Sequence, residues 1–140
     1  MIPKTAEYAL RAAVTLARAP DRSRSAEEIA EATHVPRRYA HKVLQALVRA
    51  GLVRSQPGPG GGYTLSRSPE DVSILDVVAA VAPIPRIRRC PLGLTNHTSL
   101  CPLHRQLDDA AANMERAFAA VTLAQLLNQT RSVPPLCEVT

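Results

Sequence analysis

The amino-acid sequence predicts a mainly α-helical fold with one small β-hairpin. Three observations carry this prediction. Two short helical segments meet at a tight turn, the second of them has a face of purely positive charge, and a glycine-rich hairpin follows it directly. Together they predict a winged helix-turn-helix, the arrangement in which a basic helix enters the major groove of DNA. A long C-terminal dimerisation helix is expected to complete the fold.

A first helix is expected over residues 4 to about 19. Alanine and leucine recur there at helical spacing, and Pro20 ends the pattern. This helix would pack behind the helix-turn-helix as the third member of its core. Glu7 lies near the start of the helix, where the helix dipole favours an acidic side chain.

The helix-turn-helix itself is expected to begin at Ser25. Ser25 and Glu28 have the spacing of a capping box, so a short helix should start there, and residues 33–35 interrupt it. Pro36 suits the first position of a second helix, because its φ is preset and it has no N–H group to leave unpaired.

The second helix is expected to run to about Ala50 and to stop at Gly51, a residue suited to the left-handed position past a helix end. Its basic face spans about 140° of the helical wheel. That face comprises Arg37, Arg38, His41, Lys42, Gln45 and Arg49. No acidic residue of this helix interrupts the face, although a solvated helix usually mixes charges for i,i+4 pairing. The face favours a DNA-reading helix over the alternative, a helical hairpin with a solvated cationic side.

Two short strands are predicted next, over residues 52–55 and 63–66, because apolar and polar residues alternate in both. The intervening residues 56–62 are rich in proline and glycine, which only a turn or a loop tip tolerates. No Gly-Lys-Ser/Thr sequence follows and no helix is expected to begin there, so a nucleotide-binding loop is not expected. A two-stranded ribbon in this position is a wing, with Arg54 and Arg67 placed to contact phosphates.

The charge distribution agrees with a nucleic-acid surface in the first half of the chain. The net charge is +5, of which residues 1–67 contribute +6 and residues 68–140 contribute −1. Fifteen of the 17 cationic side chains are arginine, the better side chain for bidentate contacts with phosphate or guanine. The 140 residues allow one compact domain plus an appendage, with an aliphatic core because aromatic residues make up only 3%.

The DNA-binding domain is expected to end with one more short helix. Ser73 can cap a helix over residues 74–82, and the prolines at 83 and 85 mark the boundary of the domain, which we place at residues 1–85.

The last helix of the sequence is predicted to be long and continuous. Apolar residues recur at three- and four-residue steps from Leu103 to Asn128, which predicts a helix about 35 Å in length. We expect residues 105–128 to form a dimerisation stem between two copies of the chain. The alternative is a helix that folds back on its own domain. Residues 129–140 are expected to form a flexible tail.

Residues 86–104 are expected to form an irregular loop that binds metal. Cys90 and Cys101 supply thiolates, His104 follows at Cys-x-x-His spacing, and His97 lies between them. Thiolate and imidazole ligands together suit an iron–sulfur cluster or zinc. Three arginines at the start of the loop, Arg86, Arg88 and Arg89, would balance the charge of an anionic cluster. Cys137 stands apart in the tail and is not expected to take part.

Several motifs follow one another in a specific order. They are the opening Thr5-Ala-Glu-Tyr-Ala-Leu-Arg11, the wing sequence Gly60-Gly-Gly-Tyr-Thr-Leu65, the helix starting Ser73-Ile-Leu-Asp-Val-Val, the cysteine loop and the long last helix. In these motifs and their order, residues 1 to about 127 resemble the IscR/NsrR family of bacterial winged-helix regulators. The resemblance implies a dimer whose loop over residues 86–104 holds an iron–sulfur cluster, and it implies that the state of this cluster tunes DNA binding.

The loop also departs from the family pattern, which has three cysteines at Cys-x5-Cys-x5-Cys spacing and sometimes a following histidine. Cys90 matches the first cysteine, Cys101 the third and His104 the histidine, but no cysteine occurs near residues 96 and 97. This favours a [2Fe–2S] cluster with mixed ligands over a four-iron cluster. The resemblance also implies that Glu7, from the partner subunit, can complete the ligand set. The alternatives are zinc, or a cluster-free protein that senses through its thiols.

We therefore expect a cytoplasmic, dimeric transcriptional regulator that senses redox state, iron or nitric oxide. The alternative is a small zinc- or iron–sulfur-binding electron-transfer or structural protein, which would not need a wing beside a basic helix. An enzyme is not expected, because no Ser/His/Asp or paired-carboxylate constellation is present. No apolar run is long enough to span a bilayer.

The expected partner is double-stranded DNA with a pseudo-palindromic operator, because two wings would be related by the two-fold axis of a dimer. The residues expected to contact it are Ser25, Arg37, Arg38, Tyr39, His41, Lys42, Arg54, Gly60, Gly61 and Arg67.

Overall fold

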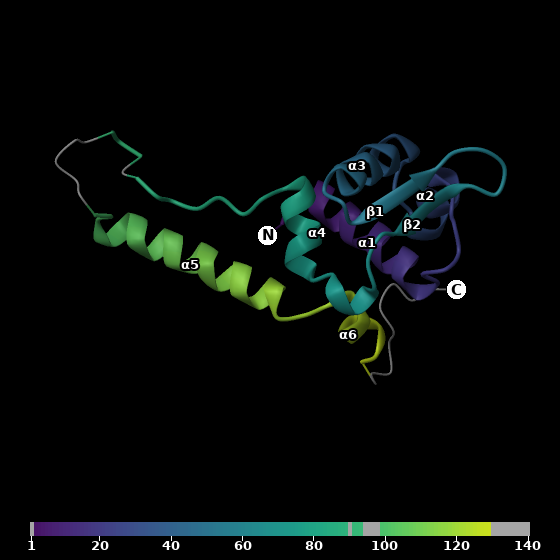
Figure 1. Cartoon of the computed structure of the whole chain (residues 1–140). Coiled ribbons are helices and arrows are strands. Elements are labelled where there is room, and N and C mark those ends of the chain that lie inside the picture. The colour runs from purple at the N-terminus through teal and green to yellow at the C-terminus, as the bar shows by residue number, and fades with distance from the viewer. Residues whose placement is uncertain (1, 90, 94–98, 130–140) are drawn as a thin grey trace.

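The computed structural model describes residues 2–89, 91–93 and 99–129. Its elements are α1 (Lys4–Arg18), α2 (Ala26–Thr33), α3 (Arg37–Arg49), β1 (Val53–Gln56), β2 (Gly62–Leu65), the 3-10 helix η1 (Pro69–Asp71), α4 (Ile74–Val81), α5 (Pro102–Ala119) and α6 (Leu123–Leu127). Figure 1 shows α1 to α4 and the hairpin gathered in one compact body, with α5 extending away from it. The mainly helical winged fold is therefore confirmed.

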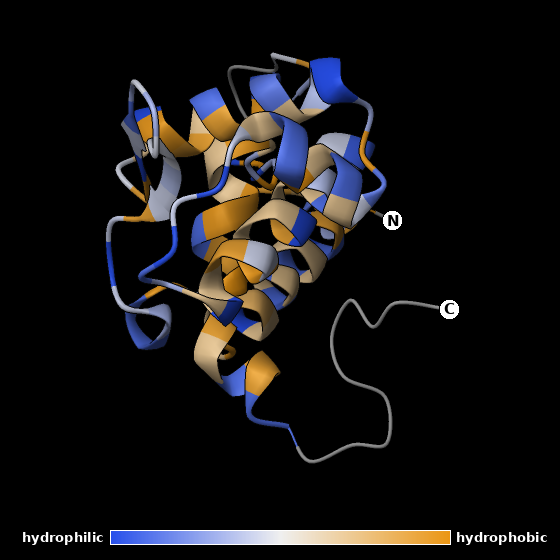
Figure 2. Cartoon of the chain, turned by 90° about the vertical axis from the view of Figure 1, so that its right-hand side faces the viewer, coloured by the Kyte–Doolittle hydropathy of each residue, from blue (hydrophilic) through white to orange (hydrophobic). Residues whose placement is uncertain are grey.

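Helix α1 forms the centre of the core. Its buried face consists mostly of alanine, together with Leu16. Because alanine has no side chain beyond Cβ, α3 and α4 pack closely against α1, and their larger side chains fill the core. The largest fully buried residues include Ile29, Leu44, Leu47 and Val77. Figure 2 shows the hydrophobic residues where these helices face one another and the hydrophilic residues on the outer turns.

The helix-turn-helix forms as expected. The hydroxyl oxygen of Ser25 caps α2 by accepting a hydrogen bond from the amide of Glu28, at 3.1 Å. His34 ends α2 in the left-handed conformation with φ of 57°. Pro36 lies one position earlier than expected: it is the N-cap of α3 rather than its first residue, because its carbonyl already accepts the amide of Ala40. Gly51 follows α3 with φ of 78°.

The wing consists of β1, β2 and the connecting residues 57–61. The two strands are antiparallel, with Val53 opposite Leu65 and Gln56 opposite Gly62. The backbone of Arg24 pairs with Tyr63 through two hydrogen bonds of 3.1 and 2.7 Å, so the segment before α2 lies along the outer strand. A Cβ atom on Gly62 would lie 2.5 Å from the carbonyl oxygen of Arg24, and only glycine permits this approach.

Helix α4 begins with a complete capping box. The Ser73 side chain accepts the amide of Asp76, and the Asp76 carboxylate accepts the amide of Ser73. Val77 and Val78 on this helix are fully buried. Within the described ranges, no helix combines the length and the apolar character that crossing a bilayer requires.

The prediction of one continuous helix over residues 103–128 is wrong. Helix α5 ends at Ala119, and Thr122 caps a separate short helix, α6, through a capping box with Gln125. The interruption has a clear cause, because the amide of Ile74 bonds to the carbonyl of Val121 and the amide of Leu123 bonds to the carbonyl of Val72. Leu123 of α6 is fully buried in the core of the winged domain. The chain thus returns to its own domain after α5.

Candidate nucleic-acid interface and cysteine loop

Helix α3 presents the basic face to solvent. The side chains of Arg37, Arg38, His41, Lys42, Gln45 and Arg49 are all exposed, and the buried residues Ala40, Val43, Leu44 and Leu47 hold the other side of the helix in the core. The helix is therefore fixed through its apolar side, while its cationic side faces solvent. This arrangement suits a helix that docks into a groove of DNA.

Tyr39 lies between the core and the basic face. It is 37% exposed, and its ring packs at 5.7 Å, tilted by 56°, against the ring of Tyr8 on α1. The guanidinium of Arg38 lies 5.6 Å above the Tyr39 ring, and that of Arg11 lies 5.5 Å above the Tyr8 ring. The aromatic pair thus supports the arginine at the start of α3.

The basic face has an acidic neighbour that reasoning along the single helix missed. Oε1 of Glu27, on α2, lies 2.9 Å from Nη2 of Arg37 and 3.5 Å from Nε2 of His41. The bond from Arg37 and the charges of Arg37 and His41 lower the pKa of Glu27 below its usual range. Glu27 and Arg37 lie ten positions apart in the sequence and on different helices, so the spacing of residues within α3 cannot reveal this pair.

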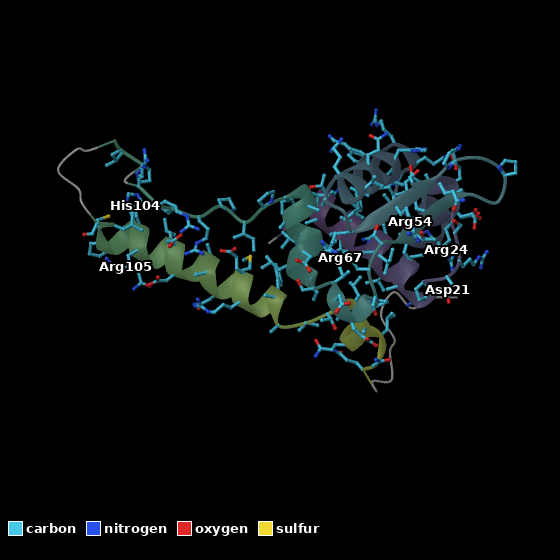
Figure 3. The ribbon with its side chains drawn as sticks, in the orientation of Figure 1. Asp21, Arg24, Arg54, Arg67, His104 and Arg105 are labelled. Carbon is cyan, nitrogen blue, oxygen red and sulfur yellow. The ribbon has the colours of Figure 1, made fainter. Side chains whose placement is uncertain are left out.

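The wing places further candidate residues on the same domain. Arg54 is exposed on β1, opposite Thr64 of β2, and Arg67 is exposed just after β2. Figure 3 shows Arg54, Arg67 and Arg24 in the region of the hairpin. Gly60 and Gly61 lie in the turn between the strands, and Ser25 is the N-cap of α2.

The cysteine loop is described only in part. Cys90 and His97 lie outside the described residues, as does Cys137. At the other end of the loop, Sγ of Cys101 lies 3.2 Å from Nδ1 of His104 at the start of α5. The thiol and the imidazole therefore point to the same place, which agrees with the expected ligand pair. Among the described residues, no group of three or more His, Cys, Asp and Glu side chains lies close enough to hold a metal ion.

Glu7 lies far from this loop within one chain. It belongs to α1 in the winged domain, where its carboxylate pairs with Arg11 at 3.1 Å, whereas Cys101 and His104 lie at the outer end of α5 (Figure 3). Arg11 also donates to the carbonyl of Thr33 at 3.2 Å and so fixes the end of α2. Within one chain, Glu7 therefore does not lie beside Cys101 and His104.

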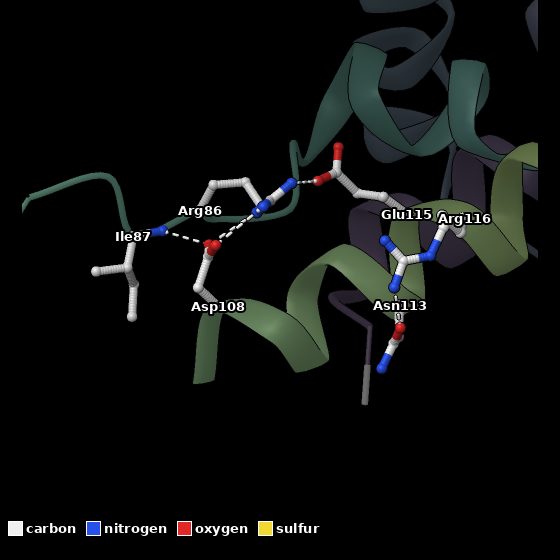
Figure 4. Close-up of polar contacts among 6 residues, drawn as sticks. All are labelled: Arg86, Ile87, Asp108, Asn113, Glu115 and Arg116. Atoms are coloured by element: carbon white, nitrogen blue, oxygen red, sulfur yellow. Dashed lines mark hydrogen bonds and ion pairs between the residues drawn. The ribbon is translucent and has the colours of Figure 1, made fainter. Parts of the chain in front are cut away.

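A second feature that sequence spacing missed is the Arg86 clasp, formed by Arg86, Asp108 and Glu115. The guanidinium of Arg86 bonds to both carboxylate oxygens of Asp108, at 2.7 and 2.9 Å, and to Glu115 at 2.7 Å. The amide of Ile87 donates to Asp108 at 2.8 Å. Figure 4 shows these contacts joining the segment after α4 to α5, beside a separate contact between Asn113 and Arg116.

The clasp is held by hydrogen bonds between charged groups that lie partly out of water. The side chain of Arg86 is 26% exposed and that of Asp108 is 16% exposed. The bonds from Arg86, followed by the amide of Ile87, hold the pKa of Asp108 far below its usual range, and the pKa of Arg86 is raised by the same contacts. The start of the cysteine loop is thus fixed to α5.

Comparison with known proteins gives consistent matches over nearly the whole chain. The sequence pattern of the Rrf2 family, described as iron-dependent transcriptional regulators, matches residues 2–129. The protein BadM of Rhodopseudomonas palustris, named as an HTH-type transcriptional regulator, is 32% identical over 133 residues, covering 93% of this chain and 85% of BadM. An rrf2-like HTH-type regulator of Rhodobacter capsulatus is 33% identical over 132 residues, covering 91% and 85%.

Solved structures share the fold at lower sequence identity. The structure of IscR from T. potens matches with a TM-score of 0.77 and 22% identity, covering 94% of this chain and 88% of that one. CymR, named as the global cysteine regulator of B. subtilis, matches with a TM-score of 0.74 and 23% identity, covering 90% and 95%. Both likenesses concern the arrangement of the elements.

The Arg86 clasp predicts an acid-sensitive contribution to stability. The pKa of Asp108 is lower in the folded chain than in the unfolded chain, so the stabilisation is complete above the unfolded pKa and is lost as the pH falls below it, from about pH 4 downward. Arg86→Gln should lower the thermal midpoint at pH 7 by a few degrees, and the difference from wild type should shrink at pH 3. Arg89→Gln, an equal change of charge at an exposed residue, is the control. A constant difference between Arg86→Gln and wild type at both pH values would contradict this account.

Proposed function

The chain belongs to the Rrf2 family of iron-dependent transcriptional regulators, and we propose that it acts as a dimer that reads a pseudo-palindromic operator and senses redox state, iron or nitric oxide through a [2Fe–2S] cluster. Family membership confirms the resemblance stated from the sequence, the expectation of DNA binding and the expectation that the protein is not an enzyme. Since transcription is regulated at the chromosome, we place the protein in the cytoplasm.

The observation that carries the DNA-binding proposal is the exposed basic face of α3 beside the wing. Arg37, Arg38, His41 and Lys42 would enter the major groove with Tyr39, while Arg54, Arg67 and the Gly60–Gly61 turn would lie against phosphates. Ser25 would contact the backbone from the start of α2, where N–H groups point toward an anion. The excess charge of residues 1–67 supports the same surface.

The dimer proposal rests on the uncovered side of α5. All of α5 is described, and none of its residues is buried. Leu103 is 63% exposed and Leu107 is 52% exposed. Leu107 and Met114 line a largely apolar groove of about 470 Å³ between α5, α4 and residues 83–87. A second copy of the chain with its own α5 would cover these side chains, which water disfavours.

The cluster proposal rests on the donor chemistry of the loop. Cys101 and His104 already converge at one turn of α5, and Cys90 would bring the second thiolate. His97 is a further candidate, and Glu7 would reach the site only from the partner subunit. Such a cluster would supply reversible one-electron chemistry, and an imidazole ligand would make it less negative and raise its potential. The residues of the chain would hold the cluster and transmit a change in the loop to α5 through the Arg86 clasp.

Substitutions on α3 and in the wing should have different effects on DNA binding. Arg38→Ala should weaken operator binding by about 1–3 kcal/mol and relax base preference if Arg38 reads a guanine. Arg54→Ala should lower affinity for all sequences alike and reduce the salt slope by about one unit. Fluorescence anisotropy with labelled duplexes over a range of salt concentrations measures both effects. Unchanged operator affinity in both variants would refute the placement.

Loss of either loop cysteine should remove the cluster. Anaerobically purified Cys90→Ala and Cys101→Ala should lack visible absorbance and iron. Each substitution removes one of the two thiolates that would hold the cluster in the protein. Cys137→Ala should retain both and serves as the control. Absorption spectra and iron analysis provide the measurement. A colourless wild-type protein with stoichiometric zinc, or with no metal after anaerobic reconstitution, would show that the cluster proposal is wrong.

A further inference from the structure

Helix α3 begins in an electrostatically unfavourable way. Its N-cap, Pro36, offers no side-chain hydrogen bond, and its first turn contains no acidic residue. Instead, Arg37 and Arg38 place two cations at the positive end of the helix dipole. The carboxylate of Glu27, from α2, supplies the negative charge that α3 lacks, since it contacts both Arg37 and His41.

Glu27 does more than compensate for this charge. Arg37 and His41 lie one turn apart on the exposed face of α3, and a single carboxylate oxygen contacts both. The contact restricts the guanidinium of Arg37 and the imidazole of His41 in the same region from which bases would be read. It also places a negative charge where a phosphate of DNA would otherwise approach Arg37.

We propose that Glu27 is a positioning residue that sets DNA specificity by holding Arg37 and His41 in place and opposing their use as phosphate contacts. This proposal rests on the proposed placement of α3 in the major groove. Glu27 stays negatively charged under ordinary conditions, because the bond from Arg37 keeps its pKa low.

The physical basis is a difference between two kinds of DNA contact. Non-specific binding depends on how many cations are free to neutralise phosphates. Base reading depends on the direction in which a donor points, and a side chain that is already held loses less conformational entropy on binding. A carboxylate beside Arg37 therefore penalises non-specific binding and favours the matching sequence.

The experiment compares full-length wild type with Glu27→Gln. The control is Glu31→Gln, which removes the same charge from an exposed position one turn further along α2. The probes are a random duplex and a duplex that the wild-type protein selects from random sequence. Glu27→Gln should bind random DNA about tenfold tighter, with a salt slope steeper by about 0.9 for one added phosphate contact, whereas its affinity for the selected duplex should not rise. Glu31→Gln should resemble wild type in its affinity for random DNA, in its salt slope and in its affinity for the selected duplex.

A second variant separates positioning from general electrostatics. In an Arg37→Gln/His41→Gln background, Glu27→Gln should change DNA binding no more than Glu31→Gln does, because its two partners are absent. The thermal midpoint of each variant is measured as a control for folding. A loss of folded protein would not make the salt dependence of DNA binding steeper.

The outcomes distinguish this inference from the proposed function. If wild type discriminates the selected duplex but Glu27→Gln and Glu31→Gln behave alike, the role of Glu27 is overturned while the placement of α3 stands. If wild type selects no duplex and Arg38→Ala binds as wild type does, the placement and the role of Glu27 both fail.

Discussion

The structure depends on the backbone pairing that returns the chain to its own domain after α5. The amide of Ile74 bonds to Val121, and the amide of Leu123 bonds to Val72. This pairing, together with the burial of Leu123, fixes the C-terminal end of α5. The Arg86 clasp makes the second attachment of α5, because it joins the segment after α4 to Asp108 and Glu115. Helix α5 is thus held at two places while none of its residues is buried.

Such an arrangement explains how a loop and a DNA-binding surface can be coupled at a distance. Cys101 and His104 lie at the outer end of α5, and Figure 1 shows that end well separated from α3. Because the clasp and the pairing of residues 72–74 with 121–123 attach α5 to segments on either side of α4, a shift of α5 would act on α4, which packs against α1 and α3. The two-point attachment therefore offers a physical path between the proposed cluster and the proposed operator surface.

The sequence predicted the winged domain well because its signals are local. The capping serine at 25, Gly51 after α3, the proline- and glycine-rich turn and the capping box at Ser73 each act within a few residues. The interruption of the long helix also had a local signal, since Thr122 and Gln125 have capping-box spacing. The apolar repeat outweighed this signal, because Val121, Ala124 and Leu127 continue it, although Leu127 packs against the core of the winged domain.

The features that the sequence did not predict depend on tertiary contacts. The Arg86 clasp joins residues 22 and 29 positions apart, and Glu27 reaches Arg37 and His41 from another helix. Arg86 has an adequate local explanation as a loop cation, and Glu27 has one as a favourable acid in the first turn of α2. Only the fold shows which opposite charges meet.

The central claim is that a second copy of the chain covers the exposed apolar side of α5, and sedimentation equilibrium at micromolar concentration tests it most directly. The account predicts a dimer for wild type and for the control Gln106→Glu, which alters an exposed position of α5. It predicts dissociation or unfolding for Met114→Glu, because the dimer would bury an unpaired charge in the groove that Met114 lines. A monomeric wild-type protein at this concentration would contradict the account.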